Sequence, residues 1–330
     1  MTPDFRDTRI GGMYNLVQLR TLHSVLSTGS FAATARELGY TAAAVSQQIA
    51  SLERSMGVVL FERGAHHVRP TRVAELIADR CRTIVTLLSQ LEDEVADLAA
   101  GTSGRLRLGT FPTASPSVIP RSLTRLQVEA PGAQVLLHEG KPDQLLPLLL
   151  NHELDVALAY EYALLPRSWP HELRQVLLFD EKLFLLVPAD HAVASAEYAP
   201  LSALRDETWI DSREGMPGSM VLARLAADAG FEPRVGFRTM NYEAIHGLVG
   251  AGLGLAVVAG LALRQHHNVV ALPIRHAGAT RRVVALSHRE NTNPLLRAML
   301  TALKESTRHL DSSRLPTVDF DAAARRSHAS

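Results

Sequence analysis

The sequence predicts an α+β helix-turn-helix module with a β-hairpin wing, a long linker helix, and an α/β domain made of two subdomains. Three observations support this fold class. Short amphipathic helical patterns separated by glycine occupy the first sixty residues. A heptad pattern without glycine or proline then extends from Arg72 to about Ala100. Beyond residue 104, strand-like and helix-like segments alternate, which is typical of β-α-β units.

The composition fits several folded domains and limits the range of functions. The 330 residues include 46% hydrophobic residues, enough to bury the cores of two or three domains. Lys+Arg 34 balance Asp+Glu 34, so any nucleic-acid surface must be local. The single cysteine, Cys81, excludes an intramolecular disulfide, and no apolar stretch has the length of a membrane span or of a signal peptide. We therefore expect a cytoplasmic protein without a membrane partner.

Both ends of the chain lack an apolar pattern. Residues 1–13 are expected to form a disordered lead, and translation from Met13 is the alternative interpretation of this segment. Residues 311–330 are expected to form a disordered tail.

Residues 14–71 predict three helices and a hairpin. Leu16, Leu19, Leu22 and Leu26 share one face of a first helix that ends at Gly29. The second helix runs from the N-cap Ser30 to Gly39. The third begins after the N-cap Thr41, and its apolar positions are Val45, Ile49, Leu52 and Met56.

Two short helices joined by a tight turn form the unit that lays its second helix in the DNA major groove. Gln47 and Gln48 carry amides that can pair with adenine, Ser46 can bond to any base edge, and Ala42 permits close approach. The hairpin tip after Gly57 carries basic residues suited to phosphate, including His66 and His67. The predicted DNA-binding residues are Ser30, Thr41, Ala42, Ser46, Gln47, Gln48, Arg63, Arg69 and Thr71.

Residues 72–101 predict the linker helix. Its apolar residues recur at steps of four and three, which specifies two helices packed along each other and hence a homodimer. The predicted dimerisation residues are Ile77, Cys81, Ile84, Leu88, Leu91 and Val95. The alternative is a long helix lying on the core of its own domain. Cys81 is interpreted as a small buried apolar residue in preference to a redox sensor.

Residues 104–310 predict a clamshell similar to periplasmic solute-binding proteins. Subdomain I comprises about 104–161 and 268–310, and subdomain II about 162–267. Ligands of open α/β sheets bind beyond the carboxyl ends of the strands. The loop after the first strand carries Thr113 and Ser115 close to a helix start at Pro120, an arrangement suited to an anionic or polar ligand. The alternative is that Thr113 and Ser115 only cap a helix.

Four short motifs of the N-terminal run carry a family resemblance: Gly29 to Phe31, Val45 with Ser46, Leu52 with Glu53, and Leu60, Phe61 and Arg63. With them, the run resembles the winged helix-turn-helix of LysR-type transcriptional regulators. Two departures are Ala42 and Ala43, where many members have Gln-Pro. "ELDVALAY" and "LVGAGLGLAVVAG" resemble the effector domain of the same family, so the resemblance covers about residues 14–305.

The resemblance implies a function and an effector site. It implies a regulator that binds inverted-repeat promoter DNA as a homodimer or homotetramer and responds to a small-molecule effector. The implied effector-binding residues are Thr113, Ala114, Ser115, Trp209, Asn241 and Tyr242. For Trp209 the alternative is a core position, and for Asn241 a helix N-cap.

Other chemistry finds little support in the sequence. Gly250, Gly252 and Gly254 follow a helix and precede a strand, the reverse of a dinucleotide site, so no cofactor is expected. The adjacent pairs His66-His67 and His266-His267 lack metal-ligand spacing, and no common hydrolytic or phosphate-transfer motif occurs, so neither a metal nor catalysis is expected. The alternative functions are a solute-binding receptor with a non-regulatory N-terminal module, and an architectural DNA protein.

Overall fold

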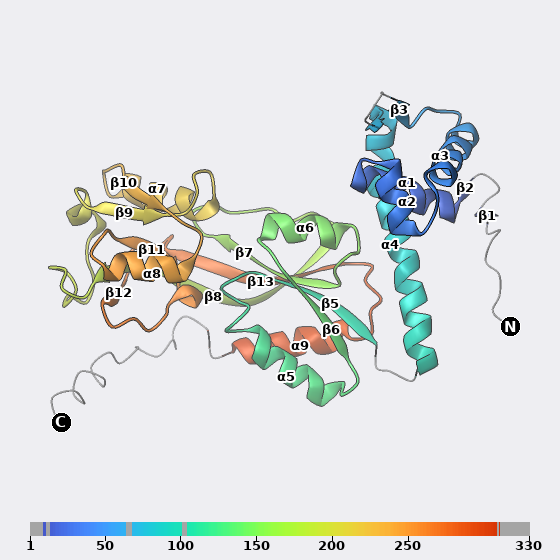
Figure 1. Cartoon of the computed structure of the whole chain (residues 1–330). Coiled ribbons are helices and arrows are strands. Elements are labelled where there is room, and N and C mark those ends of the chain that lie inside the picture. Colours follow the sequence, from blue (N-terminus) through green and yellow to red (C-terminus); the bar gives the residue numbers. More distant parts are fainter. Residues whose placement is uncertain (1–8, 11–13, 64–67, 101–103, 309, 311–330) are drawn as a thin grey trace. The chain divides into compact units, whose positions relative to one another are not determined.

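The computed structural model describes residues 9–10, 14–63, 68–100, 104–308 and 310 (Figure 1). The chain divides into two compact units. The first comprises residues 1–102 with 151–153, and the second comprises residues 103–150 with 154–330.

Three helices with the predicted boundaries begin the first unit. They are α1 (Leu16–Thr28), α2 (Phe31–Leu38) and α3 (Ala42–Met56). The side chains of Asn15, Ser30 and Thr41 each accept a hydrogen bond from a first-turn amide, which satisfies one of the amides left unpaired at a helix start. All three helices end at a glycine in the left-handed region, at Gly29, Gly39 and Gly57.

The predicted wing follows as β3 (Phe61–Arg63) paired antiparallel with β4 (Val68–Pro70). The Phe31 and Phe61 rings pack edge to face at 6.0 Å, which fixes the wing against α2. One carboxylate oxygen of Glu53 accepts from the Leu60 amide at 2.7 Å and the Phe61 amide at 3.2 Å, which ties the wing to α3. The predicted tip residues His66 and His67 lie outside the described residues.

The predicted disordered lead is wrong at two residues. Strand β1 (Arg9–Ile10) pairs antiparallel with β2 (Tyr14–Asn15), so this part of the lead has backbone partners. The rest of the predicted lead, 1–8 and 11–13, and the predicted tail, 311–330, lie outside the described residues.

Helix α4 (Arg72–Ala100) forms the linker, and its 29 residues span about 43 Å at 1.5 Å per residue. The hydroxyl of Thr71 caps it by accepting from the Ala74 amide at 3.3 Å. Its first turns pack against the module core, and Arg20 of α1 forms an ion pair with Glu92 of α4 at 2.9 Å. No helix among the described residues combines the length and the apolar character that crossing a bilayer requires.

The second unit contains a mixed sheet with the strand order β11-β8-β13-β7-β5-β6, while β12 also pairs with β8. Strands β5, β6 and β7 run parallel, as predicted, but β13 and β8 are antiparallel neighbours. The first-half elements are β5 (Arg105–Thr110), α5 (Ile119–Glu129), β6 (Gln134–Glu139), α6 (Pro142–Leu150), β7 (Val156–Tyr162), β13 (Thr280–His288) and α9 (Leu296–Thr307).

Strand β8 (Leu173–Pro188) belongs to both halves of this unit. Its first part pairs with β13 as far as Lys182, and its second part lies between β11 and β12 from Leu183 onward. The second-half elements are η1 (Leu201–Leu204), β9 (Thr208–Asp211), α7 (Pro217–Asp228), β10 (Arg234–Arg238), α8 (Tyr242–Gly250), β11 (Ala256–Ala259), η2 (Gly260–Ala262) and β12 (Val269–Pro273).

The boundary between the two halves therefore differs from the predicted one. It crosses β8 near Lys182 and lies between β12 and β13, whereas the sequence pattern placed it near residues 162 and 268. The reason is the length of β8: its first half, with exposed side chains such as Arg174 and Gln175, lacks the continuous apolar run that reveals its second half.

Candidate functional site

The outer face of α3 carries most of the predicted base-contacting residues. Ala42 and Gln47 are exposed, and Ser46 is half-buried, while Val45 and Ile49 fill the module core from the opposite face. The Thr41 hydroxyl accepts from the Ala44 amide at 3.2 Å, so this side chain organises the helix start. The helix therefore presents one amide side chain, that of Gln47, to a partner.

Gln48 faces the module interior. It is half-buried, and its Oε1 accepts a hydrogen bond from the hydroxyl of Thr21, a buried residue of α1. Gln47 and Gln48 have the same chemistry, so the sequence predicts the same role for both, but successive helical residues point about 100° apart. Gln48 thus links α3 to α1, and its predicted base contact has no support in this arrangement.

The remaining predicted DNA-binding residues lie at caps and on the wing. Ser30 caps α2 by accepting from the Ala33 amide at 3.4 Å. Thr71 donates to the Val59 carbonyl at 2.8 Å, in addition to capping α4. Arg69 is exposed on β4, and Arg63 ends β3, but its side chain lies outside the described part.

The predicted dimerisation residues lie on two different sides of helix α4. Ile77 and Cys81 pack into the core of their own module, where Cys81 is only 4% exposed, so the alternative of a helix packed on its own domain holds for this end. Burial raises the pKa of the Cys81 thiol. Leu88 is half-buried, whereas Ile84, Leu91 and Val95 are 43–57% exposed.

Exposed apolar side chains on α4 also occur outside the predicted dimerisation residues, and together they form an exposed apolar line along the helix. Leu76 is 63% and Leu87 44% exposed, and both lie on the same side of the helix as Leu91. The surface of α4 available to a second chain is therefore rotated toward Leu76 and Leu87, away from Ile77 and Cys81.

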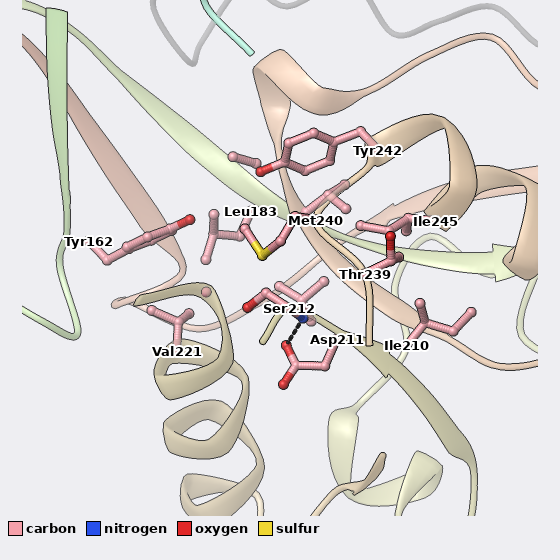
Figure 2. A pocket seen from close by; sticks show the side chains of 14 residues that line it. Tyr162, Leu183, Ile210, Asp211, Ser212, Val221, Thr239, Met240, Tyr242 and Ile245 are labelled. Carbon is pink, nitrogen blue, oxygen red and sulfur yellow. Dashed lines mark hydrogen bonds between the residues drawn. The ribbon is translucent and has the colours of Figure 1, made fainter. Parts of the chain in front are cut away.

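A small pocket in the second unit contains one of the predicted effector residues, Tyr242. It measures about 50 Å³ and lies between the end of β7, the start of α7 and the start of α8. Figure 2 shows Met240 and Ser212 pointing into this space, with Tyr162 on one side and Ile245 on the other. The hydroxyl oxygen of Ser212 is enclosed and has no hydrogen-bond partner among the described residues. Such a volume accommodates water-sized groups, well below the roughly 300–1,000 Å³ of most organic-ligand pockets.

The loop after β5, which was predicted to bind an effector, forms contacts within the protein. Thr113 is 2% exposed and accepts from Arg281 at 3.0 Å. Ala114 is fully buried, and the Ser115 hydroxyl donates to the Glu139 carboxylate at 2.5 Å. The amides of Ala114 and Ser115 both bond to the Phe111 carbonyl, so they are not directed at a ligand.

Trp209 and Asn241 take structural positions, the first in the core and the second at a helix N-cap. Trp209 is fully buried in the second-half core, where it stacks on Phe231 at 6.1 Å. Asn241 caps α8 by accepting from the Glu243 amide at 2.9 Å and the Ala244 amide at 3.3 Å.

A buried ion pair at the junction of the two halves was not anticipated. Arg281 of β13 donates to Glu181 of β8 at 2.6 Å, and the second carboxylate oxygen of Glu181 accepts from the Leu261 amide at 2.7 Å. Burial by itself lowers the pKa of Arg281, but the adjacent Glu181 carboxylate offsets this effect and raises it overall, so Arg281 remains a cation. Both residues lie in strands with a mostly apolar sequence, and no spacing rule links positions 100 residues apart.

A second, larger cavity lies next to Tyr162, on the side of α6. It measures about 420 Å³ and is lined by α6, the end of β7, the loop that follows it, and α7. Its charged residues are Lys141, Asp143, Glu161, Arg167 and Arg224. The described residues contain no group of three or more His, Cys, Asp or Glu side chains placed to hold a metal ion.

Two family models match the chain. The model described as "Bacterial regulatory helix-turn-helix protein, lysR family" matches residues 16–75, and the model described as "LysR substrate binding domain" matches residues 99–308. Together they cover the helical module and the cleft-containing unit.

Curated relatives are regulators from several bacteria. The chain is 29% identical over 267 residues to the "DNA-binding transcriptional dual regulator OxyR" of Escherichia coli K12, covering 80% of this chain and 85% of the relative. It is 28% identical over 252 residues to the "HTH-type transcriptional regulator CbbR" of Sinorhizobium medicae, covering 76% and 79%.

Solved structures share the fold. CbnR complexed with its target DNA superposes with a TM-score of 0.65 at 24% identity, covering 89% of this chain and all of that one. A single-residue variant of full-length OxyR from Pseudomonas aeruginosa gives 0.64 at 22% identity, covering 88% and 95%. With both family models matched, the chain belongs to the LysR family of bacterial regulatory helix-turn-helix proteins and is a DNA-binding transcriptional regulator with an effector-binding domain.

Proposed function

We propose that the protein binds inverted-repeat promoter sites as a homodimer or homotetramer, and that a small molecule in the cleft of its second unit changes this binding. The observation that carries the proposal is the exposure of Gln47 on α3, because an amide on the second helix of such a module can read adenine in the major groove. Because bacterial promoter DNA lies in the cytoplasm, we infer that the protein acts there.

The exposed apolar line on α4 supports association of two chains. Leu76, Leu87, Leu91 and Val95 leave a stripe in water that a second copy of the helix can cover. Two modules on one rigid dimer match two symmetric half-sites, which explains why specific recognition needs no strongly basic chain.

The junction of the two halves supports a response to a ligand. Strand β8 and the chain between β12 and β13 connect the halves, and both cavities lie beside the end of β7 at this junction. A ligand that contacts both halves favours one relative arrangement of them, with a typical coupling of about 1–3 kcal/mol to a second site.

Several curated relatives are named "Hydrogen peroxide-inducible genes activator". A thiol-based response to peroxide is not favoured in this chain. Its single cysteine, Cys81, is buried in the module core, and burial raises the pKa of the thiol, whereas oxidation proceeds through an accessible thiolate.

Selection of fragmented genomic DNA by the purified full chain, followed by sequencing, tests the proposal. The wild type should enrich a few sites that share a dyad motif, and Gln47→Ala should lose the sequence preference while keeping weak general binding. Gln175→Ala, which removes an exposed glutamine of β8, is the matched control and should select the same sites. Uniform recovery by the wild type would overturn the proposal.

A further inference from the structure

We propose that the larger cavity binds a small carboxylate with an apolar body, held by Lys141 of one half and Arg224 of the other. This inference rests on the proposed response to a small molecule and specifies the chemical class of that molecule. None of the effector residues implied by the family resemblance lines this cavity.

The charges of the cavity are unbalanced. Arg167 is paired with Asp143 at 2.5 Å, and Glu161 accepts from the Arg167 amide and lies 3.9 Å from Arg282. Lys141 and Arg224, in contrast, have no carboxylate partner in the described part of the chain. Two cations without carboxylate partners, one from each half and both lining the same cavity, favour an anion and disfavour an ammonium ligand.

The rest of the wall is apolar. Leu164, Leu165 and Pro166 follow β7, while Pro217 and Met220 contribute from α7. A cavity of about 420 Å³ falls within the usual range for organic ligands, and it combines apolar walls with few charged groups. Inorganic anions and acetate are too small to displace water from these apolar side chains, so the ligand needs an apolar body the size of a ring or a short chain.

Lys141 already reaches from one half of the unit to the other. It precedes α6 in the first half, and its Nζ lies 3.5 Å from the Sδ of Met216, the residue before α7 in the second half. A carboxylate shared by Lys141 and Arg224 would add a charged contact across the same junction. Its binding would therefore stabilise the arrangement in which α6 and α7 are close.

Isothermal titration calorimetry of the full chain at constant ionic strength tests the ligand class. The probes are benzoate and hexanoate as carboxylates with an apolar body, benzamide as a neutral ring, benzylamine as a cationic ring, and acetate. We expect benzoate or hexanoate to bind at millimolar concentration or below, and the other probes to bind more weakly. Absence of binding by both would overturn the proposal, as would equal binding of benzamide and benzoate.

Variants locate the site. Lys141→Gln and Arg224→Gln should each weaken the bound carboxylate by about three- to tenfold, because each removes one charge-assisted contact at a partly exposed site. Lys304→Gln and Arg297→Gln are matched controls, since both side chains are exposed on α9 away from the cavity. Equal losses in the controls, or no loss in the cavity variants, would overturn the assignment.

The outcome is separable from the proposed function. If dyad sites are selected from genomic DNA but no carboxylate binds, the regulator stands and the ligand class falls. If the carboxylate binds and the variants behave as expected while DNA selection is uniform, the cavity assignment stands and the proposed function falls.

Discussion

Arg281 of β13 and Glu181 of β8 form an ion pair that is almost completely buried where the two halves of the second unit meet. The pair also fixes its surroundings: Arg281 donates to the Thr113 hydroxyl after β5, and Glu181 accepts from the Leu261 amide after β11. The guanidinium lies 4.5 Å from the centre of the Tyr160 ring. One charged pair therefore connects loops of both halves.

Removing one charge of this pair should destabilise the protein strongly. Glu181→Gln leaves the Arg281 cation buried without its counterion, which typically costs about 3–5 kcal/mol. Asp180→Asn is the matched control, because Asp180 pairs with Arg282 at 3.1 Å on the same strands with both side chains more than 40% exposed. Its cost should stay below about 1 kcal/mol. Urea unfolding followed by circular dichroism measures both, and equal losses would contradict the structural role.

The two adjacent glutamines of α3 should behave differently. Gln47→Ala should leave stability unchanged within about 0.5 kcal/mol, because an exposed side chain without core contacts is lost. Gln48→Ala should cost about 1–3 kcal/mol, because the buried Thr21 hydroxyl loses its acceptor. Thermal unfolding of the full chain measures the difference. A larger loss for Gln47→Ala than for Gln48→Ala would mean that the two side chains exchange roles.

Charge on the exposed line of α4 should separate the two chains. Leu87→Glu with Leu91→Glu places carboxylates where a second α4 helix is expected to pack, so the assembly should dissociate without unfolding. Thr86→Glu, on a different side of the helix, should leave the assembly intact. Light scattering coupled to size-exclusion chromatography gives the mass of each variant. An unchanged mass in the Leu87/Leu91 variant would place the interface elsewhere.

Cys81 should be unreactive in the folded protein. Its burial and its raised pKa keep the thiolate scarce, so alkylation by iodoacetamide should be slow until denaturant is added. Affinity for the selected DNA sites should not change after treatment with hydrogen peroxide. Cys81→Ala serves as the control for peroxide effects elsewhere in the chain. Rapid labelling, or a peroxide effect abolished in Cys81→Ala, would instead establish a redox switch.

The first unit should lose stability on the acid side of neutrality. Burial, assisted by the nearby Arg82 charge, lowers the pKa of His23 below its ordinary 6.5. The unfolded chain then binds a proton that the folded module resists, so stability falls as the pH drops below about 6.5 and the loss is complete below the folded pKa. His23→Gln should reduce this slope in thermal unfolding between about pH 7.5 and 5. If the pH dependence of stability is unchanged in His23→Gln, other titrating groups cause it.

The sequence by itself determined the local structure and the family. Capping residues and terminal glycines set the three helices of the module because their effects act within a few residues, and the motifs around Phe31, Glu53 and Phe61 turn out to join α2 and α3 to the wing. Tyr242 lines the small pocket and its contact with an effector stays a prediction, whereas Trp209 is a core residue and Asn241 a helix N-cap.

The tertiary structure decided what depends on packing between distant segments. It turned Gln48 toward α1, directed Ile77 and Cys81 into the module core, and extended β8 through both halves of the second unit. It also paired Arg281 with Glu181, and brought Lys141 and Arg224 into the lining of one cavity. Periodicity shows which side of a helix or strand is apolar, but contacts between residues 27 to 100 positions apart arise only when the chain closes on itself.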